Sequence, residues 1–408
     1  MLRGRRIVLG VTGGIAAYKA AELVRELIRR GAEVRVVMTA HACEFVTPLT
    51  FETLSGRRVA TDLFHRTGDF AMDHIALADF AELAVVAPAT ANVVGKLANG
   101  IADDLLTSSL LAITAPVLLC PAMNSHMYAH PVVQENLARL ASFGYRIMEP
   151  GIGELACRTE GQGRLPEVEE IAEEIEICLT EKDLAGEKIL VTAGPTQEPL
   201  DPVRFISNHS TGKMGYALAV AARRRGAEVT LVSGPTYLAA PRGVHVIPVR
   251  TALEMYAAVM DRLKEATVVV KAAAVADFRP TRSQNHKIKK KSAALTLELA
   301  PNPDILAEIG KKKGTRVVVG FAMETEHLLE NARQKLSAKR ADFIVANDVT
   351  EAGAGFGADT NIVQILDHEG AVEAHPLMDK QAVADLILDK VKSLQVERLK
   401  PRADGRSR

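Results

Sequence analysis

Several residue types are scarce or absent in this chain of 408 residues, and each absence argues against a class of protein. The chain has no tryptophan and only 4 % aromatic residues, unlike nucleic-acid platforms that stack bases on aromatic side chains. Its four cysteines form no Cys-x-x-Cys pattern, which argues against a disulfide framework or a zinc site and favours a reducing compartment. The 50 basic and 50 acidic residues cancel, so no overall field attracts polyanions.

Long apolar runs are also missing, because none approaches the roughly 20 residues of a membrane span. The start, MLRGRR followed by IVLGV, weakly resembles a signal peptide. However, Lys19, Glu22, Arg25 and Glu26 follow at helical spacing, which indicates a first strand and helix instead. We therefore expect a cytoplasmic protein without a membrane segment.

One pattern occurs twice in the chain. Residues 5–38 and 188–233 each read as an apolar strand, a glycine-containing turn, an amphipathic helix, the pentapeptide RGAEV and a second strand. Each copy is the first half of a βαβ unit, where α/β proteins hold phosphates. The first helix is expected over about 15–30, with one face formed by Ala17, Ala21, Val24 and Ile28.

Alternating strands and helices predict an α/β fold with two Rossmann-like domains, each a mainly parallel sheet flanked by helices. The domains are expected over 1–182 and 186–398, followed by a disordered tail over 399–408. A glycine-rich loop is expected over 149–166 and an acidic helix after it. Strands are expected at 6–11, 33–38, 83–87, 116–120 and 145–148, then at 188–193, 228–232, 244–247, 267–270, 316–321, 342–346 and 361–366.

The first glycine turn, Thr12-Gly13-Gly14, lies where a strand becomes a helix, so its backbone N–H groups could approach a phosphate. It lacks the G-x-G-x-x-G fingerprint, and the second strand ends in Met38-Thr39 without the acid that binds an NAD ribose. This favours a mononucleotide such as FMN. A tight structural turn without a ligand is the alternative.

Four other segments of the first half carry candidate residues with plain structural alternatives. APATAN, over 87–92, could frame a flat ring or merely begin a helix capped by Thr90. Asn124 follows a strand end and could donate hydrogen bonds to a carboxylate or a flavin edge. His74 is either a surface helix residue or an acid–base group. Cys157 lies in the glycine-rich loop beside Arg158, and neighbouring cations lower a thiol pKa.

TGGIAAYK, MDHIALADFAE, APATAN, PAMNSHM and ACRTEGQGR occur in this order and resemble the flavin-dependent phosphopantothenoylcysteine decarboxylases over about 5–180. The resemblance implies oxidation of the substrate's cysteine thiol by FMN, loss of CO2 and reduction of the product by the same flavin. It implies that Cys157 is the proton donor, that His74 is essential and that Asn124 binds the substrate carboxylate. The FMN contacts that it implies are Thr12, Gly13, Gly14, Thr39, Ala89, Thr90 and Ser108.

The second half contains a sequence that is similar to a P-loop but fails its pattern. Ser207 stands where the motif needs glycine, and Met214 stands where it needs serine or threonine. The helix start over 210–215 still suits an anion, with a simple capped helix as the alternative. Asp277 could hold a ribose or Mg2+, whereas the lysines at 287–291 could equally be a solvated charge run.

AGPTQEPLDPVRFISNHSTGKMG, AAAVADF, KIKK, NPDIL, VGFAMET and ANDV resemble the phosphopantothenate–cysteine ligases over about 186–395. The resemblance implies activation of the phosphopantothenate carboxylate by CTP as an acyl-cytidylate, and displacement of CMP by the cysteine amine. It assigns the acyl-cytidylate step to Asn208, contacts with nucleotide and intermediate to Lys287, and Mg2+ to Asp277. CTP contacts are implied for Ala273, Asp277, Lys287, Pro303, Asp304, Ile305, Leu306, Phe321, Lys335 and Lys339.

Both halves in this order resemble the bifunctional enzymes of coenzyme A biosynthesis. The implied partners are small molecules (4′-phosphopantothenate, cysteine and CTP), not nucleic acid or membrane. The implied assembly is a homo-oligomer with trimeric flavin domains and dimeric ligase domains, for which a dodecamer is one arrangement. A pyridine-nucleotide oxidoreductase and a non-catalytic flavin-binding regulator are the rival functions, and a flavin prenyltransferase would share the first fold without needing the second half.

Overall fold

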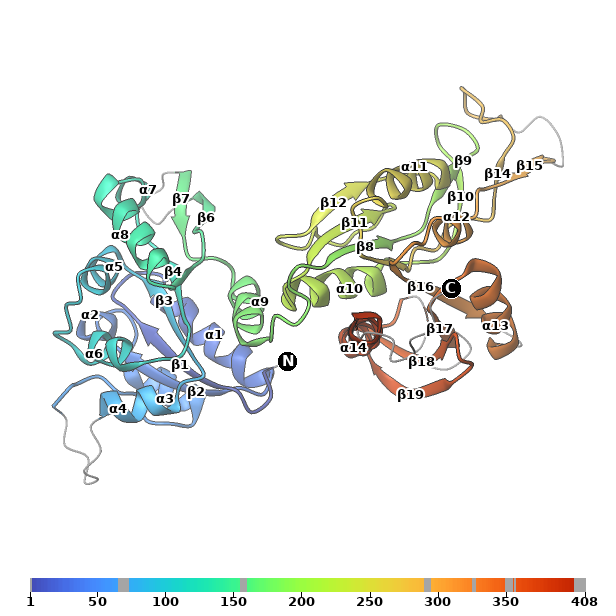
Figure 1. The fold of residues 1–408 in the computed structure, drawn as a ribbon. Helices are drawn as coiled ribbons and strands as arrows, with labels where there is room; N and C mark the ends of the chain where they lie inside the picture. Colours follow the sequence, from blue (N-terminus) through green and yellow to red (C-terminus); the bar gives the residue numbers. More distant parts are fainter. Residues whose placement is uncertain are drawn as a thin grey trace. The chain divides into compact units, whose positions relative to one another are not determined.

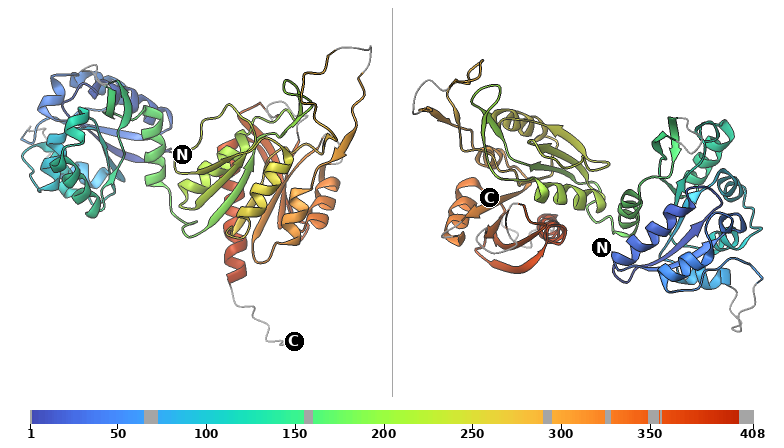
Figure 2. Two further views of the ribbon diagram at one scale, coloured as in Figure 1. Left: turned by 90° about the horizontal axis from the view of Figure 1, so that it is seen from above. Right: turned by 180° about the vertical axis from the view of Figure 1, so that it is seen from behind.

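The computed structural model describes residues 2–64, 73–154, 160–289, 295–324, 328–348, 355 and 357–399. The chain forms two compact units, unit 1 over Met1–Thr180 and unit 2 over Glu181–Arg408. Each unit has one main sheet with helices on both faces (Figures 1 and 2). The predicted fold class, an α/β chain with two mainly parallel sheets, is therefore confirmed.

The sheet of unit 1 is parallel throughout, in the order β2-β1-β3-β4-β5. This is the flavodoxin-like order, in which the winding of the chain reverses between β1 and β3. Every residue of β3 and β4 is buried, as expected for apolar runs in strands that are covered on both faces. The strands are β1 (Arg6–Val11), β2 (Glu33–Met38), β3 (Leu83–Ala89), β4 (Val117–Pro121) and β5 (Arg146–Ile147).

Two helical layers cover the sheet of unit 1. Residues Ile7 and Leu9 of β1 pack in the core of one layer and Val8 packs in the other, because side chains alternate along a strand. The first layer contains α1 (Ala17–Arg29), α3 (Pro48–Ser55) and α9 (Val168–Leu179), and the second contains α4 (Asp73–Phe80), α5 (Ala91–Ala98), α6 (Leu105–Ala112) and α8 (Pro131–Ser142).

Helix α1 lies close to its predicted range, but its buried stripe is slightly rotated from the predicted face. Ala21 and Ile28 pack only at the edge of the core. The fully buried residues are Ala17, Ala20, Leu23, Val24 and Leu27.

The expected loop over 149–166 is wrong, because most of its described residues form a β-ribbon. Strand β6 (Gly151–Glu154) pairs in antiparallel fashion with β7 (Glu160–Arg164). A Cβ atom at Gly163 would lie 2.1 Å from the carbonyl oxygen of Met123, so glycine there allows the ribbon to approach the loop after β4. The glycines that indicated a loop therefore serve close packing.

Unit 2 has a larger sheet, in the order β12-β11-β8-β13-β16-β17-β18-β19. The first six strands are parallel and the last two are antiparallel, with the winding reversed between β8 and β13. All strands but the edge strand β19 were predicted. They are β8 (Lys188–Ala193), β11 (Glu228–Ser233), β12 (His245–Pro248), β13 (Val268–Lys271), β16 (Val317–Glu324), β17 (Phe343–Asp348), β18 (Thr360–Asp367) and β19 (Val372–Asp379).

The helices of unit 2 also form two layers. Helices α10 (Lys213–Arg224) and α14 (Lys380–Leu399) cover one face of the sheet. Helices α11 (Ala252–Arg262), α12 (Ile305–Lys311) and α13 (Leu328–Lys339) cover the other. Two short antiparallel ribbons that were not predicted extend from the sheet, β9 (Gln197–Pro199) with β10 (Phe205–Ser207) and β14 (Phe278–Pro280) with β15 (Leu299–Pro301) (Figure 1).

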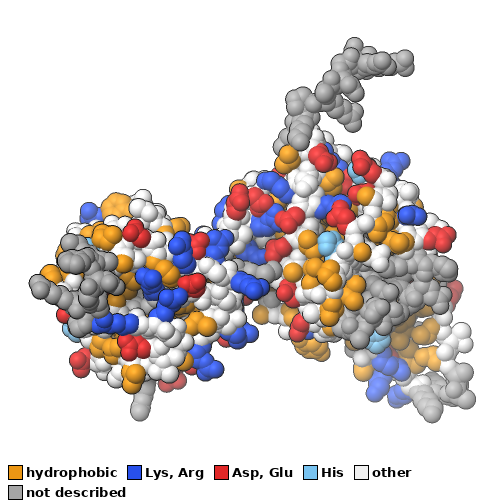
Figure 3. Space-filling model, turned by 90° about the horizontal axis from the view of Figure 1, so that it is seen from below, with side chains coloured by type: hydrophobic (Ala, Val, Ile, Leu, Met, Phe, Trp, Pro, Cys, Tyr) orange, Lys and Arg blue, Asp and Glu red, His pale blue; other side chains and the backbone are white. Residues whose placement is uncertain are grey.

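The surface reflects the balanced composition. On the face drawn in Figure 3, lysine and arginine side chains are interspersed with aspartate, glutamate and apolar side chains among the described residues. No helix within the described ranges is both long enough and apolar enough to cross a membrane.

Candidate functional site

Unit 1 has a pocket of about 1090 Å³ at the carboxyl ends of β1, β2, β3 and β4. It therefore surrounds the reversal point between β1 and β3, where open α/β sheets bind ligands. The volume lies just above the range of about 300–1,000 Å³ that is typical of small-molecule sites. The lining residues lie within 12–19, 39–41, 88–96, 122–127 and 163–165, together with Asp104 and Glu154.

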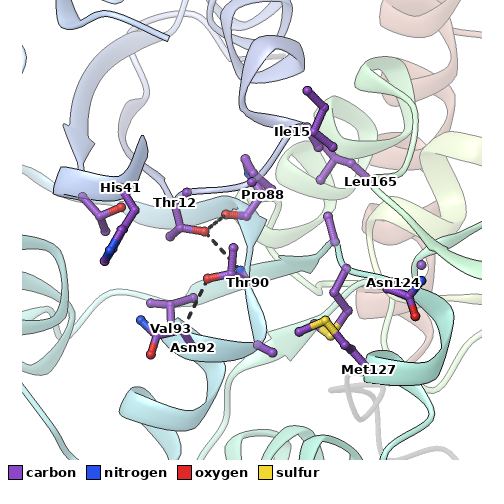
Figure 4. Close-up of a pocket in the computed structure, with 18 of the residues that line it drawn as sticks. Thr12, Ile15, His41, Pro88, Thr90, Asn92, Val93, Asn124, Met127 and Leu165 are labelled. Atoms are coloured by element: carbon purple, nitrogen blue, oxygen red, sulfur yellow. Dashed lines mark hydrogen bonds between the residues drawn. The ribbon is translucent and has the colours of Figure 1, made fainter. Parts of the chain in front are cut away.

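The turn after β1, formed by Thr12, Gly13 and Gly14, is part of the pocket wall. The buried hydroxyl of Thr12 donates to the carbonyl of Pro88 at 2.7 Å and accepts from the N–H of Thr90 at 3.1 Å (Figure 4). This hydroxyl thus joins the loops after β1 and β3, and the turn offers a ligand mainly its backbone N–H groups. A Cβ atom at Gly13 would lie 2.4 Å from the Cβ of His41, so this position requires glycine.

Thr39 and Thr90 line the pocket and also cap helices. The Thr39 hydroxyl accepts from the N–H of Ala42 at 3.3 Å, at the start of the short helix α2 (Ala40–Cys43). The Thr90 hydroxyl accepts from the N–H of Val93 at 3.5 Å, at the start of α5. The capping alternative for Thr90 is therefore confirmed, and the same residue also faces the pocket.

Asn124 lies in the pocket wall after β4, beside Met127 and away from the Thr12–Pro88–Thr90 bridge (Figure 4). Its Oδ1 accepts from the N–H of His126 at 2.9 Å and caps the short helix α7 (Ser125–Tyr128). Because the oxygen holds this turn, the amide N–H2 group is the part of Asn124 that can donate to a ligand carboxylate.

The β6–β7 ribbon adds the last section of the wall, through Glu154, Gly163 and Arg164. Cys157 belongs to the connection between these strands and lies outside the described residues, so its role stays a prediction. Within the described ranges, Cys43, Cys120 and Cys178 form no disulfide bond. Cys120 is fully buried at the end of β4, and burial raises the pKa of its thiol, as is typical of a structural cysteine.

Three predicted residues of unit 1 are not among those that line the pocket. His74 is half-buried on α4, and Ser108 lies on α6 with its hydroxyl donating to the Ala102 carbonyl at 3.3 Å. Ala89 is fully buried at the end of β3, where its carbonyl accepts from the N–H of Ala122.

In unit 2, hydrogen bonds join the loops that follow β8 and β13, the two strands at its reversal point. The N–H of Ala274 donates to the carbonyl of Gly194 at 3.0 Å, and the N–H of Ala276 donates to the hydroxyl of Thr196 at 3.0 Å. The amide of Asn208 donates to the Ala274 carbonyl at 3.0 Å. The predicted residue Asn208 therefore meets the loop that carries Ala273 and Asp277.

The NPDIL segment reaches the same loop through Asn302. Its side-chain amide donates to the Ala276 carbonyl at 2.8 Å, and its backbone N–H donates to the Asp277 carbonyl at 2.8 Å. Pro303 and Asp304 follow directly, whereas Ile305 and Leu306 are each only 2 % exposed, so their side chains belong to the core. Phe321, in the middle of β16, is half-buried against the core on the other face of the sheet.

Charged residues at the start of α12 and on α13 lie beside these loops. Lys339 pairs with Asp304 at 2.6 Å, and Asp304 caps α12 by accepting from the N–H of Ala307 at 2.9 Å. Burial acts to raise the pKa of Asp304, but the bonds from Lys339 and Ala307 hold it below its usual range. Lys335 and Lys339 are both half-buried and one helical turn apart, as predicted.

Lys271, at the end of β13, was missed by the sequence reasoning. Its Nζ donates to the carbonyl of Ala273 at 2.8 Å. Burial, reinforced by the positive charge of Lys335, lowers the pKa of Lys271 to about 8, although Asp304 and Asp277 act in the other direction. A lysine directly after the buried run Val268–Val270 is the signal that could have identified it.

Lys287 is exposed on the segment between β14 and β15. None of the described side-chain contacts joins it to the lysines of α13. Within the described ranges, no group of three or more His, Cys, Asp or Glu side chains could hold a metal ion. Asp277 is a single exposed carboxylate.

Comparison with known proteins gives matches over both units. The Flavoprotein family matches residues 1–179, and the family described as the DNA/pantothenate metabolism flavoprotein C-terminal domain matches residues 184–394. The coenzyme A biosynthesis bifunctional protein CoaBC of Bacillus subtilis (strain 168) is 51 % identical over 398 residues, which is 97 % of this chain and 98 % of that protein. The corresponding Escherichia coli (strain K12) protein is 46 % identical over 395 residues, which is 96 % of this chain and 97 % of the relative.

A solved C-terminal domain of a coenzyme A biosynthesis bifunctional protein is 41 % identical, with a TM-score of 0.47, and the match covers 53 % of this chain and all of that structure. The full-length sequence matches span both units and cover nearly the whole of each relative. The chain therefore belongs to the family of coenzyme A biosynthesis bifunctional proteins.

Proposed function

We propose that unit 2 joins cysteine to 4′-phosphopantothenate at the expense of CTP, and that unit 1 decarboxylates the product to 4′-phosphopantetheine with FMN. The observation that carries the proposal is that each sheet gathers the matched motifs at its reversal point. Thr12, Thr90 and Asn124 line one pocket in unit 1, and Asn208 meets the Asp277 loop in unit 2. The full-length similarity to coenzyme A biosynthesis bifunctional proteins supports the same pairing of activities.

The pocket of unit 1 fits a flavin mononucleotide. The Gly13–Gly14 turn and the start of α1 offer N–H groups and a favourable dipole to the phosphate. When bound, the flavin would oxidise the thiol end of the substrate and later return the electrons. The amide of Asn124 holds the carboxylate that leaves as CO2, and Cys157 protonates the remaining enethiolate. The β6–β7 ribbon supports this assignment of Cys157, because both of its strands end at residues of the pocket wall, Glu154 in β6 and Arg164 in β7.

His74 can take its proposed role only from another copy of the chain, since it is outside the pocket of its own unit. The trimeric flavin domains expected from the sequence would supply such a copy. Mixing a His74→Asn chain with an Asn124→Asp chain tests this: shared sites predict that activity returns in the mixture. Activity that stays at the level of the separate variants would contradict it.

In unit 2, CTP fits the cluster of Lys271, Lys335 and Lys339, whose charges would neutralise its phosphates. The exposed carboxylate of Asp277 would hold Mg2+ together with phosphate oxygens. Asn208 assists formation of the acyl-cytidylate, and Lys287 contacts the nucleotide and the intermediate. The dimeric ligase domains and the cytoplasmic location remain predictions from the sequence.

Purified protein with CTP, cysteine and 4′-phosphopantothenate should be yellow and release pyrophosphate and CO2. Cys157→Ser should still release CO2 but stall before the final product, and normal turnover would contradict the assigned role. Lys287→Gln should abolish pyrophosphate release while leaving decarboxylation of supplied substrate intact. A colourless protein that FMN cannot reconstitute would overturn the first half of the proposal.

The rival oxidoreductase function has no support at the site. Strand β2 ends in Met38 and Thr39, so no acid is available there for an NAD ribose. Titration with NADH should leave the flavin spectrum unchanged.

A further inference from the structure

The carboxylate of Asp201 is buried in a loop and is not part of the cluster of Lys271, Lys335 and Lys339 that we propose for CTP. Asp201 is 1 % exposed and lies between β9 and β10. Its Oδ1 accepts from the N–H groups of Val203 at 2.8 Å and Arg204 at 2.9 Å. Its Oδ2 accepts from the Arg204 guanidinium at 2.6 Å and 3.0 Å, and this bond lowers the pKa of Asp201.

The same oxygen also reaches a segment more than eighty residues away in the sequence. Oδ2 of Asp201 accepts from the N–H of Ile288 at 3.0 Å. The guanidinium of Arg204 donates to the Ile288 carbonyl at 2.8 Å, and the N–H of Gln284 donates to the Leu200 carbonyl at 2.9 Å. These bonds fix both ends of the segment 284–288, which carries Lys287.

We propose that Asp201 is a positioning residue of the ligase: with Arg204 it fixes the segment 284–288, and thereby Lys287, relative to the loop that carries Asn208. The inference rests on the proposed ligase function for the role of Lys287. We call the hydrogen bonds of Asp201 and Arg204 to Ile288 the Asp201 clamp. The existence of this clamp does not depend on the proposed function. An exposed lysine with four freely rotating side-chain bonds gains most from such a fixed backbone, because misplacement by about 1 Å can cost about 100-fold in rate.

A carboxylate is required because every partner of Asp201 is an N–H donor. An ionised aspartate has two oxygens that only accept, whereas asparagine has one oxygen and an amide that donates. Asp201→Asn keeps the volume but turns a donor toward at least one N–H group. We expect it to lower the rate of CTP-dependent pyrophosphate release by about 10- to 100-fold.

Glu198→Gln is the matched control. Glu198 is also 1 % exposed, lies in the same ribbon and accepts from the N–H of Ala252 at 2.9 Å, at the start of α11. It has no described contact with the segment 284–288. Its substitution should perturb the ribbon but leave pyrophosphate release within about 2-fold of wild type. Equal losses in the two variants would assign Asp201 a merely structural role and overturn the proposal.

Two further readouts separate positioning from general destabilisation. In the Lys287→Gln background, which should release no pyrophosphate, Asp201→Asn should lower the affinity for CTP no further, since it acts through Lys287. A further loss of CTP affinity in the double variant would overturn the proposal. Ile288→Pro removes the N–H donor but leaves the buried carboxylate, so it should reproduce the loss even if Asp201→Asn fails to fold. Wild-type rates in Ile288→Pro would count against the clamp.

A spectroscopic probe tests the clamp independently of ligase activity. Because the chain has no tryptophan, His286→Trp places a single reporter in the fixed segment. Adding Asp201→Asn should lower its fluorescence anisotropy and increase its quenching by acrylamide, whereas adding Glu198→Gln should change neither. If the wild-type chain releases no pyrophosphate, the proposed function fails, and the probe alone decides whether the clamp exists. An unchanged probe in the Asp201→Asn protein would refute it.

Discussion

Replacing Lys271 by methionine should stabilise unit 2 near neutral pH and weaken its affinity for CTP. Lys271 ends the buried run of β13 and holds a positive charge near Lys335. Burial and this neighbour lower its pKa to about 8 from the ordinary 10.5. Below that pH the buried lysine is charged, which lowers the free energy of unfolding of the protein. Methionine has a similar length and no charge to bury.

The magnitude follows from the shift in pKa. A difference of about 2.5 pKa units corresponds to about 3 kcal/mol at neutral pH, since each unit is worth about 1.4 kcal/mol. The hydrogen bond from Nζ to the Ala273 carbonyl is lost in the variant, which offsets about 1–2 kcal/mol of this gain. We expect Lys271→Met to raise the free energy of unfolding by about 1–2 kcal/mol at about pH 7.

The pH dependence has a definite sign. The native pKa of about 8 lies below the unfolded value, so between the two values the unfolded state binds more protons. Wild-type stability therefore rises with pH in this window, whereas the methionine variant lacks this gain. The advantage of the variant should shrink by about 2 kcal/mol between about pH 7 and pH 9.5.

Denaturant unfolding at several pH values, followed for the transition of unit 2, measures this difference. Lys311→Met is the control, because Lys311 is an exposed lysine paired with Glu308 and its pKa is raised rather than lowered. CTP should raise the melting temperature of the wild-type protein and of this control, but much less that of Lys271→Met. A stability difference that does not vary with pH would refute the reasoning.

Three other predictions concern different contacts. Gly13→Ala should lower the free energy of unfolding of unit 1 by about 1–3 kcal/mol in denaturant without ligand, because the added Cβ has no space. Gly14→Ala should cost less than about 1 kcal/mol, because the nearest described atom would be 3.6 Å from its Cβ. Asn124→Asp keeps the oxygen that caps α7 but adds a negative charge and loses the amide donor, so flavin absorbance should persist while CO2 release falls by about 100-fold or more. Asp342→Asn should destabilise unit 2 by about 3 kcal/mol in thermal unfolding. The reason is that Asp342 is only 4 % exposed and pairs with Lys313 and with Arg398 near the end of α14. A loss below about 1 kcal/mol would contradict this.

Strands and helices with strong periodicity were predictable because their patterns are local. Strand β3 and helix α1 lie within one or two residues of their predicted bounds, since buried runs and amphipathic faces are visible in a short window. The β6–β7 ribbon was not predictable in this way. Its glycines are typical of loops, and the contact between Gly163 and Met123 that explains them joins residues forty positions apart.

The candidate sites show the same division. Thr12, Thr90 and Asn124 were identified because each follows a strand at the carboxyl edge of a parallel sheet, where the fold brings such residues together. Lys271 was missed because its lowered pKa comes from burial and from the charge of Lys335 on α13, whereas the sequence shows only a lysine after an apolar run. Asp201 was overlooked for a similar reason, since its partner Ile288 lies on a distant segment.

The repeated RGAEV unit explains why one chain can hold two different nucleotide-type sites. In both copies it connects a helix to the second strand, beside a first strand that ends at the reversal point of its sheet. What differs is the connection from the first strand to the helix. In unit 1 a short turn leaves an open pocket, whereas in unit 2 the β9–β10 ribbon, Asn208 and the Asp201 clamp occupy that connection. The shared unit therefore fixes where each site lies, and the inserted segment determines which chemistry that site can support.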